Sequence, residues 1–98
     1  MDIIIQTLDF TAKDELKDFI TSKVQGITIK SFDPIRANVR LKLDKDDSGS
    51  NKICEIRIEI PGNDLYASRK AESFEAATME VLSALRNQAE KLEARRSR

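Results

Sequence analysis

Basic side chains recur near the C-terminus at a spacing that places them along one stripe of a helix. The stripe holds Lys91, Arg95 and Arg98 at positions i, i+4 and i+7, flanked by Arg86 and Arg96. Such a stripe can neutralise the phosphates of a nucleic acid, and each contact releases condensed counterions. The alternative is a solvated helix end, because cations are favoured near the negative C-terminal end of a helix dipole. Charge alone leaves both interpretations open.

Charge is unevenly distributed along the chain. The 98 residues carry 17 basic and 17 acidic side chains and no net charge, which argues mildly against nucleic-acid binding. Residues 1–20, however, hold two basic and five acidic groups, whereas residues 86–98 hold five basic and two acidic groups. Local fields act within a Debye length of ~8–10 Å, so a localised basic patch matters more than the sum.

Residue types that commonly perform catalysis are scarce. The chain has no histidine, the commonest general base and metal ligand. Cys54 stands in an alternating apolar segment, so we expect an inert core thiol rather than a nucleophile. The three glycines stand apart and form no phosphate-binding loop. We therefore expect a protein that is not an enzyme, with no catalytic residue and no cofactor.

Membrane insertion and secretion are also disfavoured. The longest apolar run is Ile3–Ile5, which is too short for a transmembrane helix or the core of a signal peptide. A lone cysteine without a signal peptide is typical of a reducing cytoplasm. We expect a cytoplasmic protein with no membrane partner.

One spacing matches that of a calcium-binding loop. The residues at EF-hand positions 1, 3, 5, 6 and 12 are Asp44, Asp46, Ser48, Gly49 and Glu55. An EF-hand loop connects two helices, however, and this segment connects two strand-like segments. Asn51 also occupies the eighth position, where an apolar residue is usual. We therefore favour a solvated hairpin loop and predict no metal site.

The N-terminal third predicts a strand followed by a helix. Residues 2–8 are rich in β-branched side chains, as is typical of a strand. Thr11 is expected to open a helix by capping its first turn, with Asp14 three residues later. Apolar residues then recur at helical spacing, and Gly26 is a natural end of the helix. The apolar positions are Leu16, Phe19, Ile20, Val24 and Ile27.

Strict alternation predicts two strands in the middle of the chain. Over residues 35–43, the side chains expected to face the core are Ile35, Ala37, Val39, Leu41 and Leu43. Over residues 53–60, they are Cys54, Ile56, Ile58 and Ile60. Residues 61–64 form a turn, and residues 65–70 can pair as a fourth strand.

A long helix is expected to follow Ser73, whose side chain caps its start. No glycine or proline interrupts residues 73–98, and residues 93–98 form a basic helical tail. The apolar side chains expected to form its buried stripe are Phe74, Ala77, Val81, Leu85, Ala89 and Leu92.

The element order β-α-β-β-β-α limits the topology of this single domain, residues 1–98. The first helix must cross over between parallel strands and so lies on one face of the sheet. Because the strands have one apolar side, the second helix should pack on the same face. We predict an α+β fold with a four-stranded mixed sheet and two helices on one face. The polar side chains expected on the opposite face are Arg36, Arg40, Lys42, Arg57 and Lys70, mixed with Glu55 and Glu59.

Four segments match, in order, the pattern of a known family. Residues 62–77 (GNDLYASRKAESFEAA) resemble its last strand and the start of its last helix, and residues 85–91 (LRNQAEK) look like its helix motif L-x-x-Q-L-x-K, with Ala89 at the second leucine. Residues 16–24 (LKDFITSKV) match its first helix with a late lysine, and Phe32-Asp33 the loop before its second strand. Over almost its whole length, the chain resembles the ribosome hibernation-promoting factor family, also described as ribosome-associated inhibitors or sigma modulation proteins.

This resemblance implies a fold akin to double-stranded-RNA-binding domains and a role in silencing ribosomes during stationary phase or stress. It implies binding to small-subunit rRNA in the channel for mRNA and tRNA anticodons, with no small-molecule substrate. The RNA-binding residues carried over by position are Lys23, Arg86, Lys91 and Arg95. Arg96 and Arg98 extend the same tail, and weaker candidates on the sheet are Arg36, Arg40 and Lys42.

The chain departs from the family pattern in its charges. Glu90 and Glu93 dilute a tail that is usually rich in lysine, and Glu75 stands where an aromatic residue is frequent. The chain resembles the short class, which lacks the C-terminal domain that dimerises ribosomes, and a weak homo-oligomer is compatible with the sequence. Two alternatives remain open: a protein-interaction module that uses the exposed sheet face or an edge strand, and a general double-stranded-RNA binder.

Overall fold

The computed structural model describes residues 1–27, 33–45 and 49–96 and confirms the predicted order of elements. The elements are β1 (Asp2–Leu8), α1 (Asp14–Gln25), β2 (Arg36–Leu43), β3 (Lys52–Ile60), β4 (Asn63–Ala71) and α2 (Phe74–Arg96). Phe32, Asp46, Ser48 and Arg98, which the sequence analysis singled out, lie outside the described residues.

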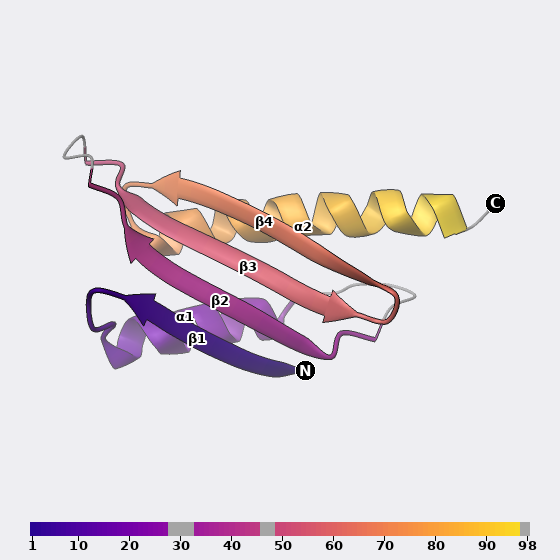
Figure 1. The fold of residues 1–98 in the computed structure, drawn as a ribbon, viewed down its shortest axis with the longest axis horizontal. Coiled ribbons are helices and arrows are strands. Elements are labelled where there is room, and N and C mark those ends of the chain that lie inside the picture. Colours follow the sequence, from indigo (N-terminus) through magenta and orange to yellow (C-terminus); the bar gives the residue numbers. More distant parts are fainter. Residues whose placement is uncertain (28–32, 46–48, 97–98) are drawn as a thin grey trace.

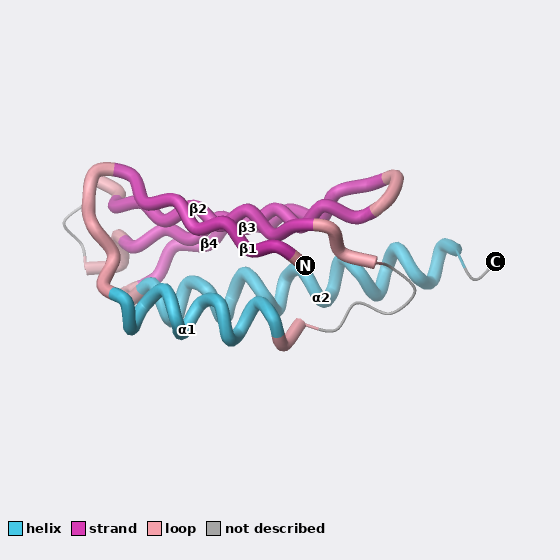
Figure 2. The backbone as a smooth tube through the Cα atoms, turned by 90° about the horizontal axis from the view of Figure 1, so that it is seen from below, coloured by secondary structure: helices cyan, strands magenta, loops and turns pink. Residues whose placement is uncertain are grey.

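The four strands form one mixed sheet in the order β1-β2-β3-β4. β1 pairs with β2 in parallel, and the two remaining pairs are antiparallel. α1 is the crossover between the parallel strands β1 and β2, as expected. Both helices lie on the same side of the sheet, and the other side is uncovered (Figures 1 and 2). The predicted α+β architecture is therefore confirmed.

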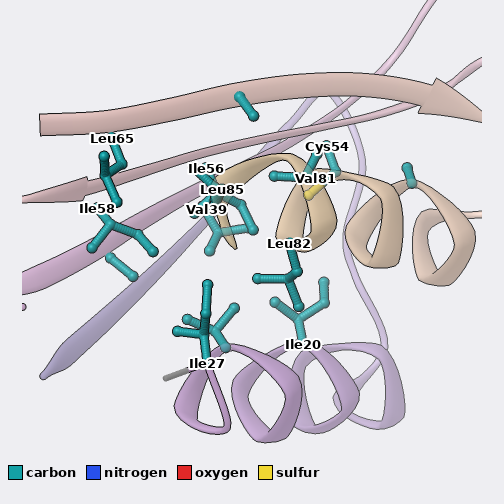
Figure 3. Packing of buried hydrophobic residues seen from close by; sticks show 14 of the residues in the cluster. Ile20, Ile27, Val39, Cys54, Ile56, Ile58, Leu65, Val81, Leu82 and Leu85 are labelled. Atoms are coloured by element: carbon teal, nitrogen blue, oxygen red, sulfur yellow. The ribbon is translucent and has the colours of Figure 1, made fainter. Parts of the chain in front are cut away.

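The core fills the space between the sheet and the helix layer. Val39, Ile56 and Ile58 of the sheet face Ile20 of α1 and Leu85 of α2, and all five are fully buried (Figure 3). Burial of each such side chain contributes roughly 1.5–3 kcal/mol relative to exposure. The core therefore fixes α2 against the sheet, and with it every side chain on the outer surface of α2.

Strand alternation is correct in the middle of β2 and wrong at its ends. Ala37, Val39 and Leu41 are fully buried, as are the inward residues predicted for β3. Ile35 and Leu43, however, are 52% and 46% exposed. Ile35 directly precedes β2 and Leu43 is its last residue, so both lie at the ends of the alternating segment. Periodicity predicts which face a side chain is on but not how much of that side chain is covered.

The two helix starts differ from each other. Ser73 caps α2 as predicted, because its Oγ accepts a hydrogen bond from the Ala76 backbone N–H at 3.0 Å. The expectation that Thr11 caps α1 is wrong, since α1 begins at Asp14 and its N-cap residue, Lys13, provides no side-chain hydrogen bond. Lys13 is still extended, with φ −70° and ψ 155°. Just before this connection, the Phe10 ring stacks on Phe74 of α2 with centroids 5.0 Å apart.

Candidate nucleic-acid interface

The long helix α2 divides the predicted basic residues between two faces. Lys91 and Arg95 are four residues apart and share one face, and both are exposed. Arg86 precedes Lys91 by five residues, which places it roughly 140° around the helix axis. The acidic residues Glu90 and Glu93 follow Arg86 at i+4 and i+7, so they belong to the Arg86 face. The acidic dilution seen in the sequence therefore falls on Arg86 and spares Lys91 and Arg95.

A groove lies between the C-terminal half of α2 and the beginning of β4. It has a volume of about 210 Å³ and is lined by Asn63, Asp64, Leu65, Gln88, Lys91, Leu92 and Arg95. The last turns of α2 project beyond the β3–β4 turn, so this end of the helix stands free of the sheet (Figures 1 and 2). Among the residues that the structure describes, neither Lys91 nor Arg95 has an ion pair or hydrogen bond through its side chain. We call Lys91, Arg95 and this groove the α2 patch.

Gln88, which lines the groove of the α2 patch, joins α2 to β4 through two hydrogen bonds. Its Oε1 accepts from the Tyr66 backbone N–H at 3.1 Å, and its Nε2 donates to the Tyr66 carbonyl oxygen at 2.6 Å. β4 is an edge strand, so these backbone groups have no strand to pair with. The side-chain amide takes the place of that strand. Sequence reasoning included Gln88 in a family-like segment but gave it no role.

Lys23 and Arg86 belong to the helix layer but not to the α2 patch. Lys23 lies in the last turn of α1, and its Nζ is 5.7 Å from the centroid of the Phe19 ring. Arg86 is exposed on α2. α1 and α2 lie side by side beneath the sheet (Figure 2). The structure thus keeps both residues on the helical side of the molecule, away from the groove residues.

The two remaining candidates of the C-terminal tail have no described side chain. α2 continues through Arg96, so that residue is on the helix as predicted, but its side chain is outside the description. Arg98 lies beyond the described residues altogether.

The basic residues of the uncovered sheet face are mostly paired with carboxylates of neighbouring strands. Arg36 Nη1 lies 3.0 Å from Glu59 Oε2, and Lys42 Nζ lies 2.8 Å from Glu55 Oε1. Two further pairs join Arg57 to Asp64 at 3.6 Å and Lys70 to Asp44 at 3.0 Å. Solvent-exposed pairs of this kind add little to stability, but each also cancels the charge that a phosphate would meet.

Arg40 is the exception on this face. Its guanidinium has no ion pair or hydrogen bond with any residue in the described part of the chain. Its positive charge still acts on Glu55, where it adds to the larger effect of the Lys42 hydrogen bond in lowering the pKa of the carboxyl. The pKa of Glu59 is lowered as well, first by the hydrogen bond from Asn38 and then by that from Arg36.

The residues considered for catalysis and metal binding are engaged elsewhere. Cys54 is fully buried, and desolvation raises the pKa of its thiol to about 11, so a thiolate does not form near neutral pH. Glu55 and Asp44, two of the calcium-loop residues, are paired with Lys42 of β2 and Lys70 of β4, respectively. No group of three acidic or cysteine side chains within the described ranges is placed to hold a metal ion.

None of the described helical segments combines the length and the apolar character needed to cross a bilayer.

Comparisons with known proteins agree with this fold. The structure is similar to a ribosomal subunit interface protein from Coxiella burnetii, with a TM-score of 0.85 and 16% identity over 96% of this chain and 99% of that one. It is also similar to the N-terminal domain of Protein Y from Thermus thermophilus, with a TM-score of 0.77 and 19% identity over 94% and 99% of the two chains. No curated protein matches the sequence significantly.

The sequence also matches a family model over nearly its whole length. The model described as "Sigma 54 modulation protein / S30EA ribosomal protein" matches residues 3–97, nearly the whole chain. The proteins of this family associate with ribosomes and are not enzymes, in agreement with the sequence prediction. This chain therefore belongs to the sigma 54 modulation protein / S30EA ribosomal protein family.

Proposed function

We propose that this protein binds small-subunit rRNA through the α2 patch and thereby keeps idle ribosomes silent. The observation that carries the proposal is the pair Lys91 and Arg95, which face outward beside a groove without a carboxylate partner in the described structure. Four exposed or half-exposed cations of the sheet face, Arg36, Lys42, Arg57 and Lys70, are by contrast paired with carboxylates.

The α2 patch suits a phosphate backbone better than it suits a base edge. Lys91 and Arg95 are separated by one helical turn, about 6 Å along the axis, so they can contact neighbouring phosphates of one strand. Asn63 and Gln88 add polar groups to the same groove. Phosphate contacts position a protein on RNA without reading sequence, so the shape of the rRNA supplies the specificity.

The proposed place of binding rests on the resemblance to the family. Membership in it supports ribosome association, and the relative from Coxiella burnetii is named for the subunit interface. We place the contact in the channel for mRNA and tRNA anticodons, where an occupant blocks initiation during stress or stationary phase. In this proposal the protein acts in the cytoplasm as a single ribosome-binding domain, and Lys23, Arg86, Arg96 and Arg98 make peripheral contacts.

The test is cosedimentation with purified small subunits at several salt concentrations. Lys91→Gln combined with Arg95→Gln is expected to weaken binding at least tenfold, because two phosphate contacts are lost. The plot of log affinity against log salt should also become shallower, its negative slope shrinking in magnitude by about 1.5. The matched control, Arg36→Gln with Lys42→Gln, removes the same charge from paired positions and should change the affinity less than threefold. Equal losses in the two double variants would refute the α2 patch as the binding surface.

A protein-interaction module is the rival function. The closure of β4 by Gln88 argues against docking of a strand at that edge. A purified subunit stripped of proteins near the channel discriminates the two functions, since the rRNA proposal expects binding to be retained. Binding to a naked RNA duplex as tight as to the subunit would instead indicate a general double-stranded-RNA binder.

A further inference from the structure

The uncovered face of the sheet contains a hollow that the proposed function does not use. It has a volume of about 170 Å³ and is lined by Asn38, Arg40, Glu55, Arg57 and Tyr66. Asn38, Arg57 and Tyr66 are cross-strand neighbours in one row, and Arg40 and Glu55 form the adjacent row. The helices are on the opposite side of the sheet (Figure 2). The hollow is therefore distinct from the α2 patch.

The Tyr66 ring and the Arg57 guanidinium lie together in the lining of the hollow, and we call them the platform. Tyr66 is 44% exposed, and the guanidinium carbon of Arg57 lies 5.2 Å from the centroid of its ring. Gln88 holds the Tyr66 backbone, while the Tyr66 hydroxyl donates to Glu55 Oε2 at 3.3 Å. The ring is thus held at both ends. Aromatic rings and guanidinium planes are the surfaces on which unstacked nucleobases stack.

The charge of the hollow favours an anion beside that platform. Arg40 brings a guanidinium that has no partner in the described structure, whereas Arg57 is shared with Asp64. The one carboxylate in the lining, Glu55, is held by Lys42 at 2.8 Å and by the Tyr66 hydroxyl, so its charge is largely compensated. A guanidinium without a partner is the preferred protein group for a phosphate.

Asn38 supplies a hydrogen-bond acceptor next to the platform. Its Nδ2 donates to Glu59 Oε2 at 2.8 Å, which fixes the orientation of the amide. The carbonyl oxygen Oδ1 is left to accept from an N–H group of a ligand. The hollow thus contains a surface for stacking, a cation for an anion and a hydrogen-bond acceptor of fixed orientation, all within two adjacent rows of cross-strand neighbours.

We propose that this hollow binds a nucleoside phosphate, with the base stacked on Tyr66 and Arg57, the phosphate on Arg40 and a base N–H donating to Asn38. The ligand is a nucleotide of single-stranded RNA or a free nucleotide, which share this chemistry. In the ribosome-bound protein it would be a second contact, on the face opposite the α2 patch.

The chain provides its own probe for this site. Tyr66 is the only tyrosine, and there is no tryptophan, so intrinsic tyrosine fluorescence reports on the platform alone. The experiment titrates the full chain with a single-stranded adenine-rich RNA decamer and, separately, with AMP. Stacking is expected to quench the emission. Arg40→Gln should weaken the binding about tenfold, as expected for loss of a charge-assisted hydrogen bond. Arg36→Gln, a paired cation on the same strand and face, should change it less than twofold.

The outcomes separate this site from the proposed function. Quenching retained in Lys91→Gln with Arg95→Gln supports an independent site, and quenching by AMP as strong as by the decamer identifies a free nucleotide as the ligand. No quenching by either nucleotide, or equal effects of Arg40→Gln and Arg36→Gln, would overturn the proposal even if cosedimentation with small subunits persists. Quenching by an acidic peptide, but not by RNA or AMP, would also overturn it, in favour of a protein partner.

Discussion

The uncovered sheet face and the C-terminal half of α2 both carry exposed basic side chains, but the two surfaces handle their charge in opposite ways. On the sheet, Arg36, Lys42, Arg57 and Lys70 each meet a carboxylate of a neighbouring strand or loop. On α2, Lys91 and Arg95 meet none in the described structure. The number of basic residues is the same kind of observation on both surfaces and does not distinguish them. The presence or absence of counterions within the fold does, and the proposed binding surface rests on that difference.

The largest effect, on the free energy of unfolding, is expected from truncating a buried side chain that packs α2 against the sheet. Leu85→Ala empties a fully buried position against the sheet and should lower the free energy of unfolding by about 2–5 kcal/mol. The ion pairs of the open face do not depend on this contact. Urea denaturation measures the loss, and Met79→Ala, an exposed position on the same helix, is the control with an expected change within about 0.5 kcal/mol. A loss below 1 kcal/mol for Leu85→Ala would mean that the core does not fix α2.

A smaller loss of stability is expected from removing the two Gln88 hydrogen bonds that join α2 to β4, which we call the Gln88 clamp. Gln88→Ala removes both hydrogen bonds to Tyr66 and should cost about 1–2 kcal/mol of stability, because an edge backbone loses its partners. It should also loosen the α2 patch relative to β4. Thermal unfolding checks the first effect, and amide hydrogen exchange at Tyr66 checks the second. Asn87→Ala, next to the clamp and exposed, is the matched control; equal exchange rates in the two variants would count against the clamp.

The smallest effect concerns the pH dependence of the sheet face. The pKa of Glu55 is lowered from 4.5 in the folded protein, mainly by the Lys42 hydrogen bond. Its contribution to stability is therefore present above about pH 4.5 and is lost as the pH falls through the lower folded pKa. Glu55→Gln should flatten the stability curve in this acidic range by under about 1 kcal/mol. Stability curves of Lys91→Gln and the unaltered protein should run parallel there. A flattened curve for Lys91→Gln would show that the α2 patch also contains an ion pair.

Much of the fold could be predicted from the sequence because it depends on the local spacing of apolar residues. Alternation correctly placed Val39 and Ile58 inward, and helical spacing correctly placed Val81 and Leu85 in the core. Local period does not predict every position. α1 begins at Asp14 and not directly after Thr11, and Ile35, which alternation placed in the core, is exposed.

The candidate site was predictable only in part. Helical spacing brought Lys91 and Arg95 together, and the same spacing places Arg86 with Glu90. Which sheet cations are neutralised depends on register, since Arg36 and Glu59 are 23 positions apart in sequence and become neighbours only when β2 pairs with β3. The two hydrogen bonds of Gln88 to an edge strand have no local signal, because they span 22 positions.

The hydrogen bonds from Gln88 of α2 to β4 also affect how a strand of another molecule could add to the sheet. A sheet of this kind has two outer strands to which a strand of another copy can add, and growth into a fibre requires both. On β4, Gln88 occupies the backbone of Tyr66, and the Arg69 guanidinium donates to the Ser68 carbonyl oxygen at 2.8 Å. The outer side of β1 carries no neighbouring strand in the described structure. A strand of another copy that adds to β4 must therefore displace these contacts, whereas at β1 it would meet no such side chain in the described structure.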